Sequence, residues 1–402
     1  ENALNAVSLA FPVQNLMIAV ATGTGVGINA LLSRSLGEKR FERANLTASN
    51  GVFLGLCSAV AFAVLGALFS RTFFLVQTDV ADIVEGGTAY IRICTVCSFG
   101  IFTAISIERL LQATGKTIYS MITQMVGAVI NIIFDPIFIF VFDMGVAGAA
   151  WATVLGQVVG AALGIYFNAR KNMEITLSFR GFRPSGEVIR RIYSVGVPSI
   201  IMASIGSVMT FGMNKILIGF TTTATAVFGV YFKLQSFVFM PVFGMNNGLV
   251  PIVAYNFGAR KPERMVKAVR LGVIYATAIM AAGVALFQLI PHLLLGLFDA
   301  SDYMLEIGVP ALRIISFHFL LAGFGIVSSS FFQSLGHGVL SLIISLVRQL
   351  IVLLPAAWLL SLSGQLNMVW WAFPIAEIFS VTLSILFLIY AYRKEVKPML
   401  AE

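Results

Sequence analysis

Residues 14–44, "QNLMIAVATGTGVGINALLSRSLGEKRFERA", decide the fold, because their pattern returns at residues 235–265 as "QSFVFMPVFGMNNGLVPIVAYNFGARKPERM". Each copy is a long apolar stretch that ends in a basic segment. Beyond these copies, the same spacing is kept as far as Gly115 and Gly336. It pairs Gln14 with Gln235, Gly23 with Gly244, Gly27 with Gly248, Gly37 with Gly258 and Arg43 with Arg264. A constant spacing over about a hundred residues indicates two homologous halves.

The composition places both halves in a membrane. Of the 402 residues, 58% are hydrophobic and 11% are charged, and the mean hydropathy is +0.93. Soluble domains carry about 25% charged residues, so this chain lacks the polar surface that water requires. The sequence predicts an all-α polytopic membrane protein with about eleven spanning helices. The apolar stretches lie near 8–33, 46–70, 87–112, 117–141, 145–168, 193–218, 224–253, 267–297, 305–331, 338–361 and 367–392.

The connecting segments alternate in charge and predict the topology. The segments "SRSLGEKRFERA", "NARKNMEITLSFRGFRPSGEVIRR" and "NFGARKPERMVKAVR" and the tail "YRKEVK" are basic, whereas "QTDVADIVEGG" and "DASDYMLEIG" are acidic. Lys and Arg collect on the cytoplasmic side, so we expect a cytoplasmic C-terminus and an external residue 1. The basic residues should face lipid headgroups, and we expect no nucleic-acid partner.

The domain organisation follows from this topology. Both copies of the basic loop fall on the same side, so the halves should be parallel repeats of six helices. The helix at 193–218 opens the second half, and its counterpart would precede residue 1, so the first helix of the first half is expected to be missing here. We predict an N-lobe at 1–168, a basic cytoplasmic linker at 169–192, a C-lobe at 193–392 and a cytoplasmic tail at 393–402.

Residues 130–139, "INIIFDPIFI", place Asn131 and Asp135 one helical turn apart in an apolar run. An ionised carboxylate facing lipid costs about 2.5–3.5 kcal/mol, so Asp135 should face a cavity or a partner. At 1.5 Å per residue, Asp135 lies roughly 10 Å below the outer end of its helix, and Thr153 and Gln14 each lie about 12 Å below theirs. These oxygen atoms suit a hard cation, and a desolvated carboxylate could instead carry a proton. A structural hydrogen-bond network at the Asp135–Pro136 step is the alternative.

Several motifs resemble the MATE family, the multidrug and toxic compound extrusion transporters. They are "SLAFPVQNLMIAVATGTGVGINALLSRSLGEKRFERA", "LLQATGKTIYSMITQMVGAVINIIFDPIFIF", "GVAGAAWATVLGQ", "VPIVAYNFGARKPERMVKA" and "SLVRQLIVLLP". The resemblance leans toward the MepA-like branch, and it implies two six-helix lobes around a central cavity. It also implies export of amphipathic, often cationic, drugs or toxins in exchange for Na⁺ or H⁺. By the resemblance, Asn131, Asp135 and Thr153 match the N-lobe cation site of the family. We add Gln14 to this candidate site because it lies at a similar depth.

The second half carries different polar groups. The stretch aligned with Asn131 and Asp135 reads "VRQLIVLLPAAW", so coupling should be confined to the first half. Lys233 and Glu377 lie at similar depth with opposite charge, which suggests a buried pair, either as a strut or in a cavity wall. Aromatic and Met side chains near them could line a promiscuous cavity. We therefore predict a substrate cavity with Lys233, Gln235, Met240 and Glu377.

The remaining motifs exclude other classes. No Walker, metalloprotease or nucleophile-elbow motif is present, so we expect a transporter driven by an ion gradient, with no cofactor beyond the coupling cation. Cys94 and Cys97 lack the further ligands of a zinc site and should pack in the core. The expected protein is a monomer in the bacterial inner membrane. Two alternatives stay open, namely a lipid-linked precursor flippase of the same superfamily and a non-transporting fragment.

Overall fold

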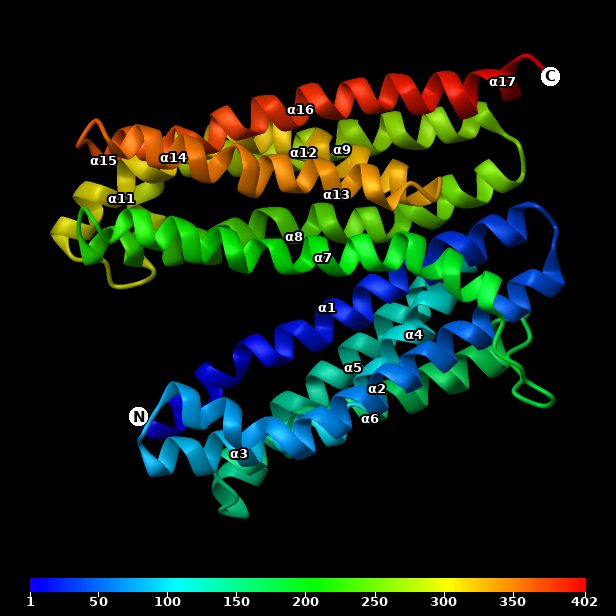
Figure 1. Ribbon diagram of the computed structural model, residues 1–402, viewed down its shortest axis with the longest axis horizontal. Helices are drawn as coiled ribbons and strands as arrows, with labels where there is room; N and C mark the ends of the chain where they lie inside the picture. Colours follow the sequence, from blue (N-terminus) through cyan, green and yellow to red (C-terminus); the bar gives the residue numbers. More distant parts are fainter. The chain divides into compact units, whose positions relative to one another are not determined.

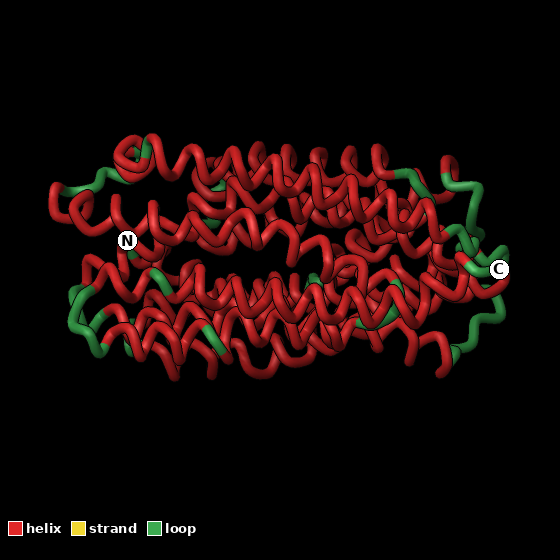
Figure 2. The backbone as a smooth tube through the Cα atoms, turned by 90° about the horizontal axis from the view of Figure 1, so that it is seen from above, coloured by secondary structure: helices red, strands yellow, loops and turns green.

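The computed structural model describes residues 1–402, and its chain is built of helices joined by short loops (Figures 1 and 2). Helices form the only regular secondary structure, which confirms the all-α fold class. The chain divides into two compact units, Glu1–Ile200 and Ile201–Glu402. The division falls inside one helix, after the linker that the sequence predicts at 169–192.

Unit 1 contains six helices, a π-helical turn and the start of a seventh helix. The α3–α4 pair is bent by 44° and is long and apolar enough, taken together, to make one span. The elements are α1 (Asn2–Gly37), α2 (Phe41–Gln77), α3 (Ala81–Val96), α4 (Phe99–Ala113), α5 (Thr117–Pro136), the π-helical η1 (Ile137–Val141), α6 (Val146–Lys171) and α7 (Gly186–Leu217), which continues into unit 2.

Unit 2 repeats this plan with more interruptions. Its long helices are α8 (Thr222–Gly258), α9 (Pro262–Leu289), α11 (Asp302–Ile315), α12 (Phe319–Ser334) and α16 (Ala372–Ala391). Shorter helices are α10 (Pro291–Gly296), α13 (Gly338–Leu346), α14 (Leu353–Ser361), α15 (Leu366–Trp370) and α17 (Lys397–Leu400). The turns η2 (Ser316–His318), η3 (Val347–Ile351) and η4 (Tyr392–Val396) connect them, and η3 and η4 are π-helical.

The number of spans agrees with the hydropathy pattern. Ten helices are long and apolar enough to cross a membrane, and the bent α3–α4 pair raises the number to eleven. Each apolar stretch found in the sequence corresponds to one of these spans. Chain hydropathy alone therefore locates the helices, because a spanning segment needs about 20 apolar residues.

The repeat is also visible in the backbone. Residues with positive φ recur in both halves at the spacing that the sequence predicts. Lys39 (φ 58°), between α1 and α2, corresponds to Arg260 (φ 55°), between α8 and α9. Non-glycine residues rarely adopt this left-handed conformation, so its recurrence indicates a shared turn geometry. The other matching positions are Gly115 (φ 80°) with Gly336 (φ 88°) and Asp143 (φ 53°) with Gly364 (φ 73°).

The two units differ in how their cores are built. Unit 2 has one continuous core, which runs from Met209 to Val396. Unit 1 has two separate hydrophobic clusters, and α1 contributes to both of them. Its residues up to Ala21 join one cluster, and its residues from Ile28 onward join the other. The segment of α1 between the two clusters, residues 22–27, reads "TGTGVG", and we call it the waist of α1 because its glycines have no side chains.

Glycines in this waist bring α1 into backbone contact with the first half of α7. A Cβ atom on Gly27 would overlap the carbonyl oxygen of Ile192, and one on Gly23 would lie 2.7 Å from the amide nitrogen of Ile200. Because both obstacles are backbone atoms, rotation of a side chain cannot remove either clash. The close approach anchors the start of α7 on unit 1.

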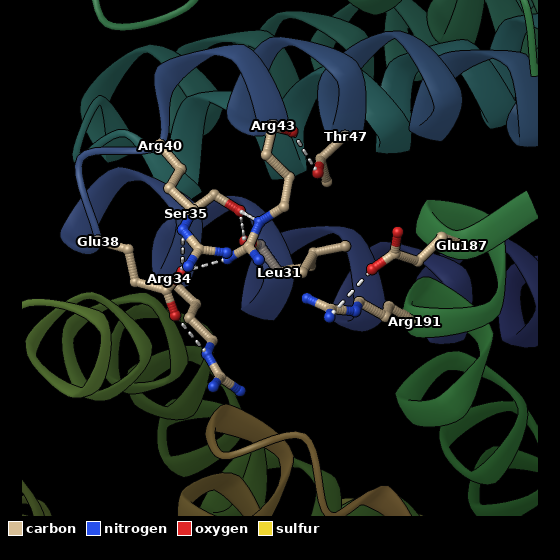
Figure 3. A network of polar contacts seen from close by, with 9 residues as sticks. All are labelled: Leu31, Arg34, Ser35, Glu38, Arg40, Arg43, Thr47, Glu187 and Arg191. Carbon is tan, nitrogen blue, oxygen red and sulfur yellow. Dashed lines mark hydrogen bonds and ion pairs between the residues drawn. The ribbon is translucent and has the colours of Figure 1, made fainter. Parts of the chain in front are cut away.

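One carboxylate organises the turn between α1 and α2 (Figure 3). Glu38 accepts from Arg34 Nε at 3.0 Å and from an Arg43 guanidinium nitrogen at 2.5 Å, and Arg40 Nε lies 3.5 Å away. Burial raises the pKa of Glu38, but the Arg34 hydrogen bond and the charges of Arg43, Arg34 and Arg40 outweigh it and hold the pKa below its ordinary value. Glu38 therefore keeps three mutually repelling arginines together.

We expect Gly27→Ala to destabilise the protein by about 1–3 kcal/mol, because an added methyl group must displace backbone in a packed contact. Gly248→Ala is the matched control. Gly248 holds the equivalent position in α8, where a Cβ atom meets nothing within 4 Å. Its substitution should be neutral or slightly stabilising, since Ala favours helix over Gly by about 1 kcal/mol. Thermal unfolding of both purified variants in detergent measures the difference, and equal losses would contradict the contact.

We expect Glu38→Gln to lower stability at neutral pH by on the order of 1 kcal/mol, the upper range for exposed ion pairs. Because folding depresses the pKa of Glu38, its contribution is present above the ordinary value of 4.5 and is lost as the pH falls below it. The gap between wild type and variant should therefore shrink below about pH 4.5. Glu42→Gln, an exposed carboxylate with no ion pair, is the control. A gap that stays constant with pH would refute this role.

Candidate functional site

Helices α5 and α6 touch at their backbones, and this contact builds the first candidate site. A Cβ atom on Gly127 would lie 3.0 Å from the Gly156 carbonyl oxygen, and one on Gly156 would lie 2.6 Å from the Gly127 carbonyl oxygen. Small residues allow such close approach between membrane helices. The Asn131 side chain lies one turn further along α5, with its Cβ 3.5 Å from the Cβ position of Gly156. Polar side chains on this turn can therefore reach from one helix to the other.

Helix α5 turns Asn131 and Asp135 away from its exposed apolar stripe. Asn131 and Asp135 are half-buried, as the sequence predicts for intramembrane polar groups. The π-helical turn η1 begins directly after Pro136, whose missing N–H removes one regular helical hydrogen bond. The exposed stripe of α5 consists of Ile118, Met121, Met125, Val129, Ile132 and Ile133.

Asn131 links Asp135 to Thr153. In the amide orientation that satisfies both neighbours, Asn131 Nδ2 donates to Asp135 Oδ2 at 2.9 Å. Its Oδ1 then lies 3.2 Å from both the hydroxyl oxygen and the main-chain nitrogen of Thr153. Asp135 Oδ1 is buried and has no hydrogen-bond partner. The cluster thus holds one carboxylate oxygen and leaves the other one available.

The opposite amide orientation fits a protonated Asp135. Asn131 Nδ2 then donates to the Thr153 hydroxyl at 3.2 Å, and that hydroxyl donates its own hydrogen to the Ala149 carbonyl oxygen at 3.0 Å. Asn131 Oδ1 would face Asp135, which can be a hydrogen bond only if the carboxyl group carries a proton. The amide orientation of Asn131 is therefore coupled to the charge state of Asp135.

Gln14 reaches this cluster through Tyr90. Gln14 Nε2 donates to the Tyr90 hydroxyl at 2.8 Å and lies 3.9 Å from Cys94 Sγ. The Tyr90 hydroxyl lies within electrostatic reach of Asp135, and no direct hydrogen bond joins Gln14 to Asp135. Sequence reasoning missed Tyr90. The only available signal was its position one turn before Cys94, on the helix face that packs toward α1.

A second candidate site is a pocket of about 320 Å³ inside unit 2. Gln235, Met240 and Glu377 line it, as three of the four predicted cavity residues. Lys233 does not line it. Other lining side chains are mostly aromatic or apolar and come from α7, α8, α12, α14 and α16. They include Met209, Phe232, Phe239, Phe243, Ala322, Ile326, Leu353 and Phe373.

Arg348 takes the place that the sequence assigns to Lys233. Arg348 belongs to the π-helical turn η3, lines the pocket and acts electrostatically on Glu377. Glu377 is 1% exposed, and its Oε1 has no hydrogen-bond partner. The expected Lys233–Glu377 pair is wrong, because Lys233 Nζ lies over the Phe298 ring, 5.6 Å from its centroid. Residues two positions apart on a helix face different ways, so Lys233 is exposed while Gln235 lines the pocket.

His318 closes the same pocket as a packing residue. It is buried, its Nδ1 lies 2.5 Å from the Ile315 carbonyl oxygen, and its ring contacts Phe239 and Phe373. The pocket lining also includes the Arg348 guanidinium and the Glu377 carboxylate, which have opposite formal charges.

Comparison with characterised proteins gives consistent matches. The MatE family model matches residues 1–137 and 198–359. The "Multidrug export protein MepA" of Staphylococcus saprophyticus is 26% identical over 374 residues, covering 93% of this chain and 82% of that protein. The protein of the same name from Staphylococcus haemolyticus is 25% identical over 390 residues, covering 97% and 86%.

Solved structures agree over the whole chain. An outward-facing multidrug resistance MATE family transporter of the MOP superfamily has a TM-score of 0.93 at 26% identity, covering 100% of this chain and 90% of that one. A MOP superfamily transporter from Pyrococcus furiosus, described as having a binding pocket of reversed polarity, has a TM-score of 0.92 at 27% identity, covering 98% and 89%. The chain therefore belongs to the MatE family of multidrug and toxic compound extrusion transporters.

Proposed function

We propose that this transporter exports small amphipathic drugs or toxins across the bacterial inner membrane in exchange for Na⁺ or H⁺, by alternating access. The names of its relatives support multidrug export. The observation that carries the coupling proposal is Asp135, with one oxygen held by Asn131 and the other buried without a partner. A carboxylate in that state gains from a bound cation, because burial has removed the water that would otherwise stabilise it.

The cluster around Asp135 suits either coupling cation. Na⁺ prefers oxygen ligands, and Asp135, Asn131 and Thr153 supply carboxylate, amide and hydroxyl oxygens. H⁺ would bind the carboxylate itself and reverse the preferred orientation of Asn131. Gln14 makes no direct hydrogen bond to Asp135 and instead donates to the Tyr90 hydroxyl, so we assign Gln14 a positioning role.

The pocket of unit 2 is the proposed substrate site. Its volume lies at the lower end of the range for ligand pockets, about 300–1,000 Å³. Aromatic rings and Met240 offer surfaces that repack around different apolar bodies. Arg348 and Glu377 would orient the polar end of the substrate. The basic loops support a cytoplasmic C-terminus, and we propose that the chain works as a monomer.

We expect Asp135→Asn to abolish most cation-driven efflux, because the amide keeps the size of the side chain and removes its charge. Loss of a hydrogen bond or contact with a charged group costs about 1.5–3 kcal/mol, so half-maximal transport should need about ten- to hundredfold more cation. Ethidium efflux from vesicles with an imposed Na⁺ or H⁺ gradient is the measurement.

Asp79→Asn is the matched control for this test. Asp79 is an exposed carboxylate in the same unit, in the loop between α2 and α3, and it makes no ion pair. It should retain wild-type cation dependence. Asn131→Ala and Thr153→Ala should raise the required cation concentration with little effect on the maximal rate. Wild-type coupling in Asp135→Asn would remove this cluster from the mechanism, and export of a lipid-linked precursor without drug efflux would favour a flippase.

We expect Gly206→Val to reduce transport of bulky substrates, because Gly206 lines the pocket and its Cβ would point toward Gln349, with Oε1 at 3.8 Å. Ethidium transport should fall about tenfold or more in kcat/KM, whereas the smaller tetraethylammonium ion should lose less. Gly229→Val, at an exposed α8 glycine with nothing within 4 Å, is the control. Equal losses for both substrates would exclude the pocket as the place where size is sensed.

A further inference from the structure

A second hollow of unit 2 lies at the end where α9 begins and α16 ends. It has a volume of about 630 Å³ and is lined by two kinds of residue. Its walls are apolar, and its rim carries three cationic side chains, Arg270, Arg393 and Lys397. The apolar walls are formed by Val266, Val269, Phe331, Leu388, Ile389 and Val396, with Tyr392 beside the rim. We call this hollow the basic groove.

The three rim cations have no anionic partner in the protein. None of the ion pairs of the chain includes Arg270, Arg393 or Lys397, and all three side chains are exposed. Glu395 pairs with His337 and Glu402 pairs with Arg260, and Glu263, in the first turn of α9, makes no ion pair with the rim. The rim therefore presents an uncompensated positive charge next to an apolar wall.

The backbone brings these cations together. The π-helical turn η4 carries Arg393, and Lys397 follows it at the start of α17, so both side chains come from the end of the last span. Arg270 comes from the third turn of α9. Exposed Val266 and Ile389 lie on the helices that flank the groove. Both helices are long and apolar enough to cross a membrane, so we expect their ends at the groove to lie where acyl chains give way to headgroups.

We propose that the basic groove binds an anionic glycerophospholipid, with its phosphate among Arg270, Arg393 and Lys397 and an acyl chain along the apolar wall. Guanidinium groups bind phosphate oxygens in pairs, and basic hollows between membrane helices bind anionic headgroups. A free phosphate would leave the apolar wall exposed, and a zwitterionic lipid would leave the positive rim uncompensated. The bound lipid would join the beginning of α9 to the end of α16. This site is separate from the proposed cation and drug sites.

The test compares lipids on the delipidated, purified full chain in a neutral detergent. Native mass spectrometry and thermal unfolding are recorded with dioleoyl phosphatidylglycerol, with dioleoyl phosphatidylcholine and with glycerol 1-phosphate. Phosphatidylglycerol should bind at least about tenfold more tightly than phosphatidylcholine and raise the unfolding temperature, because only it has a net negative headgroup. Glycerol 1-phosphate at the same concentration should have no effect. Equal binding of the two lipids, or equal stabilisation by glycerol 1-phosphate, would overturn the proposal.

Two groove variants and a charge-matched control localise the effect. The triple change Arg270→Gln, Arg393→Gln and Lys397→Gln should weaken phosphatidylglycerol binding by roughly a hundredfold. The control, Lys261→Gln, Arg264→Gln and Lys267→Gln, removes the same charge from the same end of α9, outside the groove lining. It should stay within about threefold of wild type. An equal loss in the control would show non-specific attraction and overturn the site.

Val269→Trp tests the apolar wall without changing any charge. Its indole should fill part of the groove and weaken phosphatidylglycerol binding by about tenfold, while the lipid-free unfolding temperature stays near that of wild type. Wild-type lipid affinity in Val269→Trp, with lipid binding lost only in the charge variants, would mean that no acyl chain occupies the groove. That result would overturn the proposed lipid site in favour of a headgroup contact alone.

Discussion

A polar side chain within a bilayer has no water to bind, so it needs a protein partner on its own helix or on a neighbouring one. The backbone contact between Gly127 and Gly156 makes this possible in unit 1. It brings α5 and α6 close enough for the short side chains of Asn131 and Thr153 to meet. Larger residues at the crossing would separate the helices and break the contact between Thr153 and Asn131, the residue that holds Asp135 from its own helix. The contact between Asn131 and Thr153 therefore depends on Gly127 and Gly156, two residues without functional side chains.

The two halves have kept the same scaffold and changed its polar groups. In the first half, Asp135 directly precedes the Pro136 step and the π-helical turn η1. In the second half, Arg348 lies within the π-helical turn η3 of the corresponding helix. A π-helical turn widens the helix locally and often marks a functional position. The same irregular span thus carries a carboxylate in one half and a guanidinium facing an apolar pocket in the other.

The sequence was sufficient for the spans and for part of the site. Hydropathy located every span, because a run of about twenty apolar residues is typical of a membrane-spanning helix. The helical spacing of Asn131 and Asp135 placed both side chains on one face of their helix. Depth along the helix was less informative. It grouped Gln14 directly with Asp135, whereas Gln14 hydrogen-bonds Tyr90 instead. It also paired Lys233 with Glu377, although Lys233 is exposed and does not line the pocket that Glu377 lines. Position along an axis does not specify direction around it, and that direction depends on packing against neighbouring helices.

The two separate hydrophobic clusters of unit 1 have a consequence for its cooperativity. In unit 2 one continuous core connects all the helices, so a local opening must disturb the whole of it. In unit 1, α1, α2 and α4 each contribute to both clusters, and in α1 the segment between the clusters reads "TGTGVG", where glycines weaken the helix by about 1 kcal/mol each relative to alanine. Separate clusters can have separate opening free energies, whereas the three shared helices couple the two ends of unit 1. The end that holds Tyr90 and the end that holds Glu38 therefore have separate packing but remain connected through α1, α2 and α4.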